Sequence, residues 1–139
     1  VAASRAAFFA EPDVVSVHVR LKPETTGLIT AADLGRMRPD ALFVNTSRAA
    51  LVAPGALLAA LDAGRPGMAA IDVFETEPVT DPADPLLVRP NVLATPHIGY
   101  VTEDEYQIQF TDIFDQVQAF AAGRPINAIN PEALSAAGA

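Results

Sequence analysis

Apolar residues in this chain occur in two patterns, short runs of strand length and longer stretches with helical spacing. The short runs, rich in β-branched residues or bounded by turn residues, predict four strands, at residues 14–19, 41–45, 68–74 and 92–94. The first of these, VVSVHV, is of the kind buried on both faces in parallel sheets. Capping residues, helical spacing and stop signals predict short helices at residues 4–10, 30–37 and 54–64.

The longest helix is predicted to begin after Thr102, because Thr102 and Glu105 have the spacing of a capping box. Gly123 and Pro125 mark its end, and the tail from Ile126 onward has no clear periodicity. Apolar residues recur at helical spacing along it and predict one face packed in a core: Tyr106, Phe110, Ile113, Phe114, Val117, Phe120 and Ala121.

Strands that alternate with helices through short loops indicate an α/β fold with a parallel sheet and right-handed crossovers. Ligands of such sheets bind outside the carboxyl ends of the strands. Polar residues gather after each of the four predicted strands: Arg20, then Thr46, Ser47 and Arg48, then Asp72 through Glu77, then His97. The sequence therefore predicts a site where a cation, carboxylates and a histidine meet at one rim.

Composition narrows the class of protein. Half of the 139 residues are hydrophobic, the formal net charge is −8, and there is no cysteine. A packed core is expected, a basic surface for nucleic acid is missing, and anionic membranes would repel the chain. Disulfides, thiolate metal sites and a cysteine nucleophile are excluded. We expect a cytoplasmic protein with no nucleic-acid or membrane partner.

Four motifs, in this order along the chain, carry a resemblance to a known family. They are HVRL with PET and GLI at residues 18–29, FVNTSR at 43–48, IDVFE with Glu77-Pro78 at 71–78, and NVL with TPHIG at 91–99. Together they resemble the D-isomer-specific 2-hydroxyacid dehydrogenases, which include D-3-phosphoglycerate dehydrogenase and the glyoxylate and hydroxypyruvate reductases. The resemblance covers almost the whole chain.

The resemblance implies the second half of a Rossmann-like doubly wound parallel sheet, followed by a long C-terminal helix. Residues 1–101 would be the C-terminal half of the NAD(P)-binding domain, and residues 102–139 a helix and tail returning to an absent substrate domain. The chain starts at Val1 without an initiator methionine and contains no G-x-G-x-x-G phosphate loop. We therefore expect a piece of a longer enzyme, and whether the piece is active alone stays open.

Three rim residues suit hydride transfer at C2 of a hydroxy acid. Arg48 can hold a carboxylate bidentately and stays charged. His97 can exchange a proton near neutral pH, and a carboxylate beside it would orient the imidazole. The resemblance implies the same catalytic roles for Arg48, Glu77 and His97. Glu75 is a rival carboxylate, but the family pattern places the catalytic one directly before the proline, at Glu77.

The resemblance also implies a nicotinamide cofactor, NAD, with NADP left open because the ribose-reading residue is not in the chain. Asp72 matches the family residue that accepts a hydrogen bond from the nicotinamide carboxamide, and a structural bond to local backbone is the alternative role for it. No metal site is expected. The residues implied to contact the cofactor are Val19, Arg20, Thr46, Ser47, Arg48, Asp72, His97 and Gly99.

The expected function is reversible, NAD(P)-dependent interconversion of a D-2-hydroxy acid and its 2-keto acid, with 3-phosphoglycerate among the candidate substrates. The resemblance implies a homodimer or tetramer for the full-length parent. Two rivals belong to other classes. One is a corepressor-like regulator that keeps the fold without catalysis, and the other is a hydrolase or metal enzyme that uses the same carboxylates and histidine.

Overall fold

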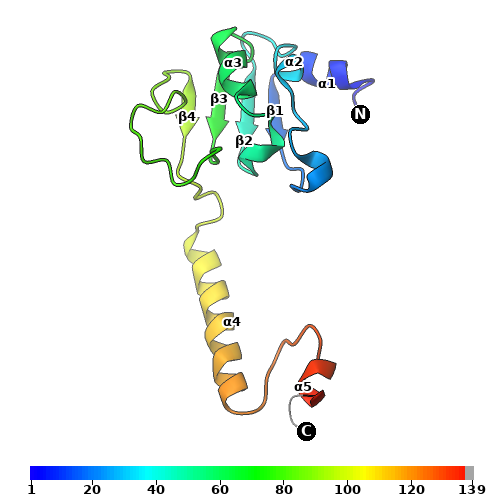
Figure 1. The fold of residues 1–139 in the computed structure, drawn as a ribbon, viewed down its shortest axis with the longest axis vertical. Coiled ribbons are helices and arrows are strands. Elements are labelled where there is room, and N and C mark those ends of the chain that lie inside the picture. The colour runs from blue at the N-terminus through cyan, green and yellow to red at the C-terminus, as the bar shows by residue number, and fades with distance from the viewer. Residues whose placement is uncertain (137–139) are drawn as a thin grey trace. The chain divides into compact units, whose positions relative to one another are not determined.

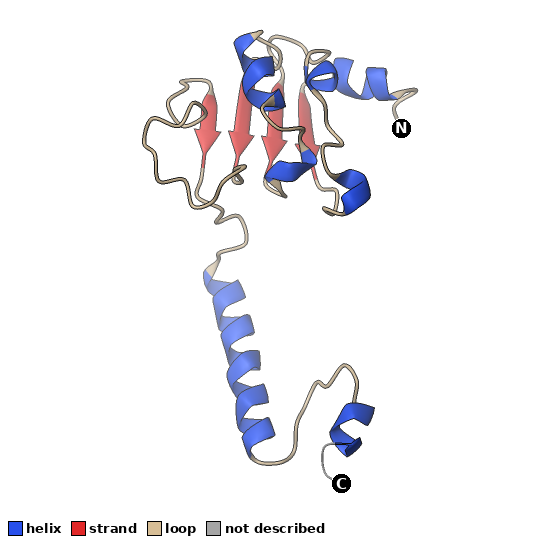
Figure 2. Ribbon diagram, in the orientation of Figure 1, coloured by secondary structure: helices blue, strands red, loops and turns tan. Residues whose placement is uncertain are grey.

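The computed structural model describes residues 1–136. Its first ninety-nine residues contain a four-stranded parallel sheet and the short helices that connect the strands. The strands lie side by side in chain order and point the same way, as Figures 1 and 2 show. They are β1 (Val14–Val17), β2 (Leu42–Asn45), β3 (Met68–Ile71) and β4 (Val92–Ala94). The predicted α/β architecture, half of a Rossmann-like sheet, is confirmed.

Short helices connect the strands: α1 (Arg5–Ala10), η1 (Pro23–Thr25), α2 (Ala31–Leu34), η2 (Ala49–Leu51) and α3 (Ala56–Asp62). Two of the predicted caps are present. Ser4 accepts a hydrogen bond from the amide of Ala7, and Thr30 forms a complete capping box with Asp33. The predicted helix at 30–37 is shorter than expected, because the α-helix ends at Leu34.

One face of the sheet is buried and the other is open, because α2, η2 and α3 supply core residues on one side. Burial alternates along β1, where Val15 and Val17 are buried while Val14 and Ser16 are exposed. The expectation of a strand buried on both faces is therefore wrong for the described residues. The buried core consists chiefly of Phe9, Val15, Val17, Leu34, Met37, Phe43, Leu51, Ala60, Leu61, Ala69 and Ile71.

An ion pair between the half-exposed Arg5 and the buried Asp33 connects α1 to α2. The Arg5 guanidinium donates to both oxygens of Asp33, at 2.8 and 2.7 Å, and to the carbonyl oxygen of Leu28. The hydrogen bond from Arg5 lowers the pKa of the Asp33 carboxyl far below its usual range, against the opposing effect of burial, and Thr30 lowers it further. Asp33 is therefore ionised inside the core and depends on Arg5 for compensation.

The second compact unit begins at Tyr100 and contains α4 (Glu103–Ala121) and α5 (Glu132–Ala136). Thr102 caps α4 through the amide of Glu105, as predicted. The reciprocal bond to the Thr102 amide is not formed, and the Glu105 carboxylate accepts from Gln109. The short helix α5 lies in the tail for which the sequence shows no clear periodicity.

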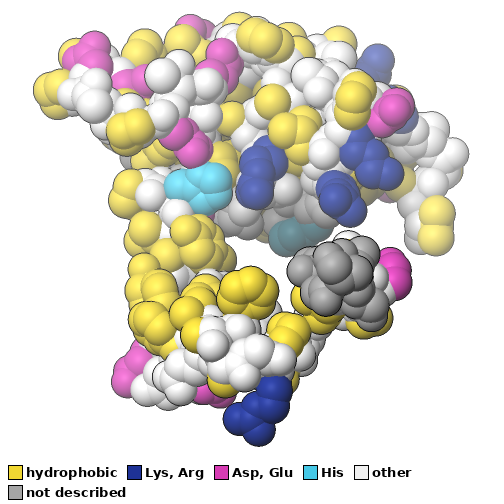
Figure 3. Space-filling view, turned by 60° about the horizontal axis from the view of Figure 1, so that its bottom comes forward, with side chains coloured by type: hydrophobic (Ala, Val, Ile, Leu, Met, Phe, Trp, Pro, Cys, Tyr) yellow, Lys and Arg dark blue, Asp and Glu magenta, His cyan; other side chains and the backbone are white. Residues whose placement is uncertain are grey.

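The apolar residues of α4 are exposed, although the sequence predicts that they pack in a core. None of the residues of α4 is buried, and Phe110, Phe114 and Phe120 expose 45%, 60% and 70% of their surface. Figure 3 shows many hydrophobic side chains at the surface of the molecule. The rings of Tyr106, Phe110 and Phe114 follow one another along the helix, with centroids 5.2 and 6.3 Å apart. Within residues 1–136, no helix combines the length and apolar character needed to cross a membrane.

Candidate active site

The predicted site residues lie at the carboxyl ends of the strands, as the parallel topology requires. Arg48 follows β2, Asp72 and Glu77 lie in the segment after β3, and His97 follows β4. Thr26, Arg48, Glu77 and His97 are among the residues that line one open hollow of about 420 Å³. The three residues predicted to be catalytic therefore share one cavity wall.

Asn45 shapes the turn that carries Arg48. Its side chain is buried at the end of β2, accepts from the Ser47 amide at 3.1 Å and donates to the Arg48 carbonyl oxygen at 3.0 Å. The Arg48 side chain is exposed, and its Nη1 donates to the Ser47 carbonyl oxygen at 2.7 Å. This role of Asn45 is not predicted from the sequence. Its polar side chain directly before Thr46-Ser47-Arg48, at the end of an apolar strand, was the available signal.

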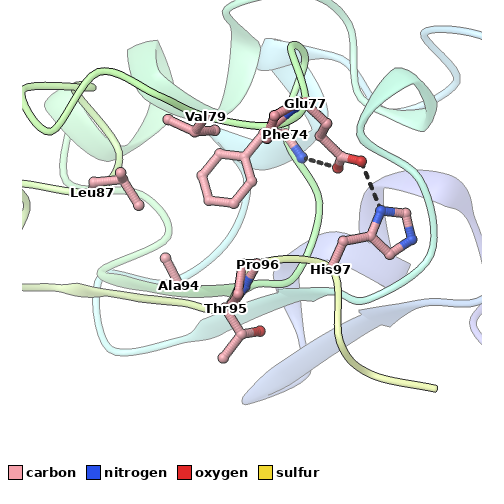
Figure 4. Close-up of a pocket in the computed structure, with 9 residues that line it drawn as sticks. Phe74, Glu77, Val79, Leu87, Ala94, Thr95, Pro96 and His97 are labelled. Atoms are coloured by element: carbon pink, nitrogen blue, oxygen red, sulfur yellow. Dashed lines mark hydrogen bonds and ion pairs between the residues drawn. The ribbon is translucent and has the colours of Figure 1, made fainter. Parts of the chain in front are cut away.

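Glu77 and His97 form a direct pair across twenty residues of sequence. His97 Nδ1 lies 2.7 Å from Glu77 Oε2, while Glu77 Oε1 accepts from the Phe74 amide at 2.8 Å (Figure 4). The His97 hydrogen bond lowers the pKa of the Glu77 carboxyl below its usual range, followed by the Phe74 amide, and the charges of His97 and Arg48 act in the same direction. Glu77 is therefore a carboxylate at neutral pH that can fix the ring and stabilise its protonated form.

A second hollow shares Glu77 and His97 with the first. It has about the same volume, 420 Å³, and is lined by this pair together with mainly apolar residues that include Phe74, Val79 and Leu87 (Figure 4). The pair thus belongs both to a hollow that contains a cation, Arg48, and to one whose wall has no Lys or Arg. A carboxylate ligand is favoured in the first hollow only.

The Glu75 carboxylate, the rival to Glu77, points to a different partner. Its Oε1 accepts from the Gly55 amide at 2.8 Å, at the start of α3. Gly55 has φ 68°, in the left-handed region that favours glycine. Glu75 therefore supports the beginning of α3, and Glu77 is the carboxylate that pairs with His97.

Asp72 is almost fully buried, with 2% of its surface exposed, and it is surrounded by donors. Oδ1 accepts from the Thr95 hydroxyl at 2.5 Å and from the Ile98 amide at 2.9 Å, and Oδ2 accepts from the Gly99 amide at 2.8 Å. Burial raises the pKa of the Asp72 carboxyl, but these hydrogen bonds and the charge of His97 lower it more, so the pKa lies below its usual value. The alternative considered for Asp72, a bond to local backbone, is therefore present.

Several of the residues expected to contact the cofactor lie close to one another at the ends of the strands. Ser47 Oγ donates to the Val19 carbonyl oxygen at 3.3 Å, which joins the ends of β1 and β2. Gly99 lies against Asp72, and a Cβ built on it would also come within 4.0 Å of Thr46. Arg20 is exposed, and its carbonyl oxygen accepts from Thr25 at 2.8 Å.

Groups of three or more His, Asp or Glu arranged to hold a metal ion are not found in the described part of the chain.

Residues 1–99 match the family model described as D-isomer specific 2-hydroxyacid dehydrogenase, NAD binding domain. The chain belongs to this family. The resemblance carried by the four motifs is thereby confirmed. The description of the family also agrees with the expected class of enzyme and with a nicotinamide cofactor, since solved relatives are named as complexes with NAD⁺ or NADP.

Individual relatives of this dehydrogenase domain cover several substrates. A glycerate dehydrogenase of Methylorubrum extorquens is 38% identical over 124 residues, which are 86% of this chain and 38% of that enzyme. The crystal structure of a phosphoglycerate oxidoreductase of Vibrio cholerae O395 aligns with a TM-score of 0.80 and 50% identity, over 87% of this chain and 38% of the other. A D-lactate dehydrogenase of Lactobacillus jensenii, solved with NAD⁺, aligns with a TM-score of 0.75 and 26% identity, over 90% of this chain and 41% of the other.

The chain spans between about a quarter and two fifths of the length of the curated relatives that it matches.

Proposed function

We propose that this chain is the nicotinamide-side half of a D-2-hydroxyacid dehydrogenase and that Arg48, Glu77 and His97 are its catalytic groups. The observation that carries the proposal is the Glu77–His97 pair at 2.7 Å, in the wall of a hollow that also contains Arg48. The enzyme would interconvert a small D-2-hydroxy acid and its 2-keto acid, with 3-phosphoglycerate among the candidates.

Arg48 would hold the substrate carboxylate. A guanidinium stays charged at all relevant pH values and can donate two parallel hydrogen bonds to a carboxylate. Its exposed side chain lines the same hollow as His97, so one small acid could reach both groups. Electrostatic attraction to the carboxylate would orient C2 and its oxygen toward the imidazole.

His97 would exchange the proton and Glu77 would orient it. Nδ1 is directed at the Glu77 carboxylate, and we propose that the other ring nitrogen, Nε2, serves the C2 oxygen of the substrate (Figure 4). In the reductive direction the imidazolium gives its Nε2 proton to the carbonyl oxygen, and in the oxidative direction the neutral ring takes the hydroxyl proton. The Glu77 charge favours the protonated ring, which the reduction consumes.

The rim also suits a nicotinamide cofactor. A carboxylate has about four acceptor positions, and Asp72 uses three of them, so one remains for a carboxamide N–H. When bound, the cofactor gives or takes the hydride at C2 of the substrate. The residues that we propose to contact it are Val19, Arg20, Thr46, Ser47, Arg48, Asp72, His97 and Gly99.

The test is NADH oxidation by the native gene product that carries these residues, with hydroxypyruvate, glyoxylate, pyruvate and 3-phosphohydroxypyruvate as substrates. We expect turnover with at least one of them. Because general acid–base groups contribute about 10²–10⁴-fold, His97→Gln should lower kcat by about 10³-fold. Arg48→Lys should chiefly raise KM for the keto acid, because an ammonium lacks the bidentate fork.

Arg36→Gln is the matched control, because Arg36 is exposed between α2 and β2 and does not line either hollow. Turnover unchanged by His97→Gln would refute the assignment of the acid–base group. A gene product that binds NADH but reduces none of the four acids would favour the corepressor-like regulator.

A further inference from the structure

The segment that carries His97 is held from both sides by a single buried carboxylate. Asp72 follows β3 directly, and its three hydrogen-bond donors are Thr95, Ile98 and Gly99. One donor precedes His97 by two residues, and the other two follow it immediately. Because the carboxylate is buried, these bonds are not exchanged with water, and breaking one leaves a charge or an amide without compensation.

The backbone of His97 needs such support. Its φ is 57°, in the left-handed region that non-glycine residues rarely adopt. This conformation is strained for a residue with a Cβ and persists only where the surrounding structure imposes it. Two backbone hydrogen bonds also hold the turn. The Thr95 amide donates to the Ile71 carbonyl oxygen and the His97 amide donates to the Thr95 carbonyl oxygen, each at 3.0 Å.

The same segment after β3 also supplies the partner of the imidazole. Phe74, two residues beyond Asp72, donates its amide to Glu77, which in turn bonds to His97 Nδ1. The position of the ring thus depends on two carboxylates, Asp72 at the backbone and Glu77 at the side chain. A shift of about 1 Å at a reacting group can cost about 10²-fold in rate.

We propose that Asp72 is a positioning residue for the reaction, whose carboxylate holds the 95–99 turn so that His97 presents its imidazole to Glu77 and to the substrate. The inference rests on the proposed function, and it goes beyond the contact with the cofactor carboxamide that the family resemblance implies for Asp72. The two roles differ in what they control. A carboxamide contact sets the affinity for NADH, whereas the turn sets the rate of proton exchange at His97.

Three substitutions disturb the turn in chemically different ways. Asp72→Asn keeps the shape but places an NH₂ donor against backbone N–H donors. Thr95→Val removes one hydroxyl donor and leaves the carboxylate in place, while Thr95→Ser retains the donor. Gly99→Ala would place a Cβ 3.0 Å from Asp72 Oδ2, closer than ordinary van der Waals contact, and would displace the carboxylate without changing any charge.

The experiment compares kcat, KM for the keto acid and the dissociation constant of NADH, measured by fluorescence without substrate, in the native gene product. We expect kcat to fall about 10²-fold in Asp72→Asn and about 10-fold in Thr95→Val and Gly99→Ala. NADH affinity should change less than threefold in Thr95→Val, and Thr95→Ser should recover most of the rate. Thr80→Val, an exposed threonine in the 78–90 segment, is the control for the threonine substitution.

A crystal structure of Thr95→Val supplies a readout that does not depend on activity. We expect φ of residue 97 to leave the left-handed region or the Nδ1–Oε2 contact to lengthen beyond hydrogen-bond distance.

Weakened NADH binding with unchanged kcat in all three variants, or an unchanged 95–99 turn in Thr95→Val, would overturn the proposal. If Asp72→Asn does not fold, the Thr95 and Gly99 variants decide. A wild type that reduces no 2-keto acid would refute the proposed function, and the crystal structure would still test the turn.

Discussion

The carboxylates of Glu75 and Glu77 lie two residues apart after β3 and have different roles because they bind different partners. Glu77 bonds to the imidazole of His97, and Glu75 bonds to the backbone amide of Gly55 at the start of α3. The difference is set by the path of the segment after Phe74, which turns Glu77 toward β4 and Glu75 toward α3. Charge alone does not distinguish them, because each is a glutamate on an exposed stretch of chain.

Glu77→Gln is expected to lower kcat/KM for the keto acid by about 10²-fold, because the glutamine can keep the bond from Phe74 but loses the charge that stabilises the protonated imidazole. The measurement is steady-state kinetics of NADH oxidation. Glu75→Gln is the matched comparison, since its amide oxygen can still accept from Gly55. Equal losses in the two variants would contradict the choice of Glu77.

At the scale of residues, the sequence allowed Arg48, Glu77 and His97 to be nominated, because uncommon side chains follow apolar strands at these positions. It did not predict the roles of Asn45 and Thr95. Their hydrogen bonds depend on how the chain turns after β2 and β4, and neither turn follows from residue spacing. For Asp72 the resemblance implies a cofactor contact, with a bond to local backbone as the alternative. Two of its three hydrogen bonds, from the Ile98 and Gly99 amides, are of this second kind.

The Arg5–Asp33 pair is the clearest energetic connection between elements. Asp33 exposes 8% of its side chain while Arg5 exposes 52%. When the pair is broken, the guanidinium can therefore be solvated by water, whereas the carboxylate loses a hydrogen-bond partner that water cannot easily replace. Its depressed pKa adds stability to the folded state at pH values above the usual value of about 3.9. That contribution is lost as the pH falls below this value toward the pKa of the folded state.

Arg5→Met is therefore expected to destabilise the fold at pH 7 by about 2 kcal/mol, the order of magnitude for a buried polar group left without its partner. The difference from wild type should shrink as the pH falls below about 4, where Asp33 of the unfolded chain is protonated. Urea unfolding between pH 2.5 and 7 measures both. Arg38→Met is the control, since Arg38 pairs with the exposed Asp13 and Asp40. A destabilisation that does not vary with pH would contradict this account.

At the scale of elements, local chemistry predicted the starts of α1, α2 and α4, because each cap involves residues within three positions. The exposure of the second sheet face could not be predicted in this way. The alternation along β1 depends on which helices cover the sheet, and the described chain supplies core residues to one face only. Of the predicted capping box at Thr102, the bond from the Glu105 amide is present, and the Glu105 side chain accepts from Gln109, one turn further along.

For the whole molecule, the chain consists of a dinucleotide-domain half, residues 1–99, and a unit from Tyr100 onward whose long helix exposes its apolar residues. The periodicity of α4 correctly indicated a helix, but an apolar stripe does not say what it packs against. The return of residues 102–139 to a substrate domain stays a prediction. The homodimer or tetramer stays a prediction for the full-length protein.

The central claim is that hydride moves between nicotinamide and C2 of a D-2-hydroxy acid while His97 moves the proton. It is tested most directly with NADH that carries deuterium at both positions of C4 of the nicotinamide and with pyruvate or hydroxypyruvate, by mass spectrometry and chiral chromatography of the product. We predict one deuterium at C2 and the D configuration only, with product formation reduced about 10³-fold in His97→Gln. A hydroxy acid without deuterium at C2, or one of L configuration, would contradict the account.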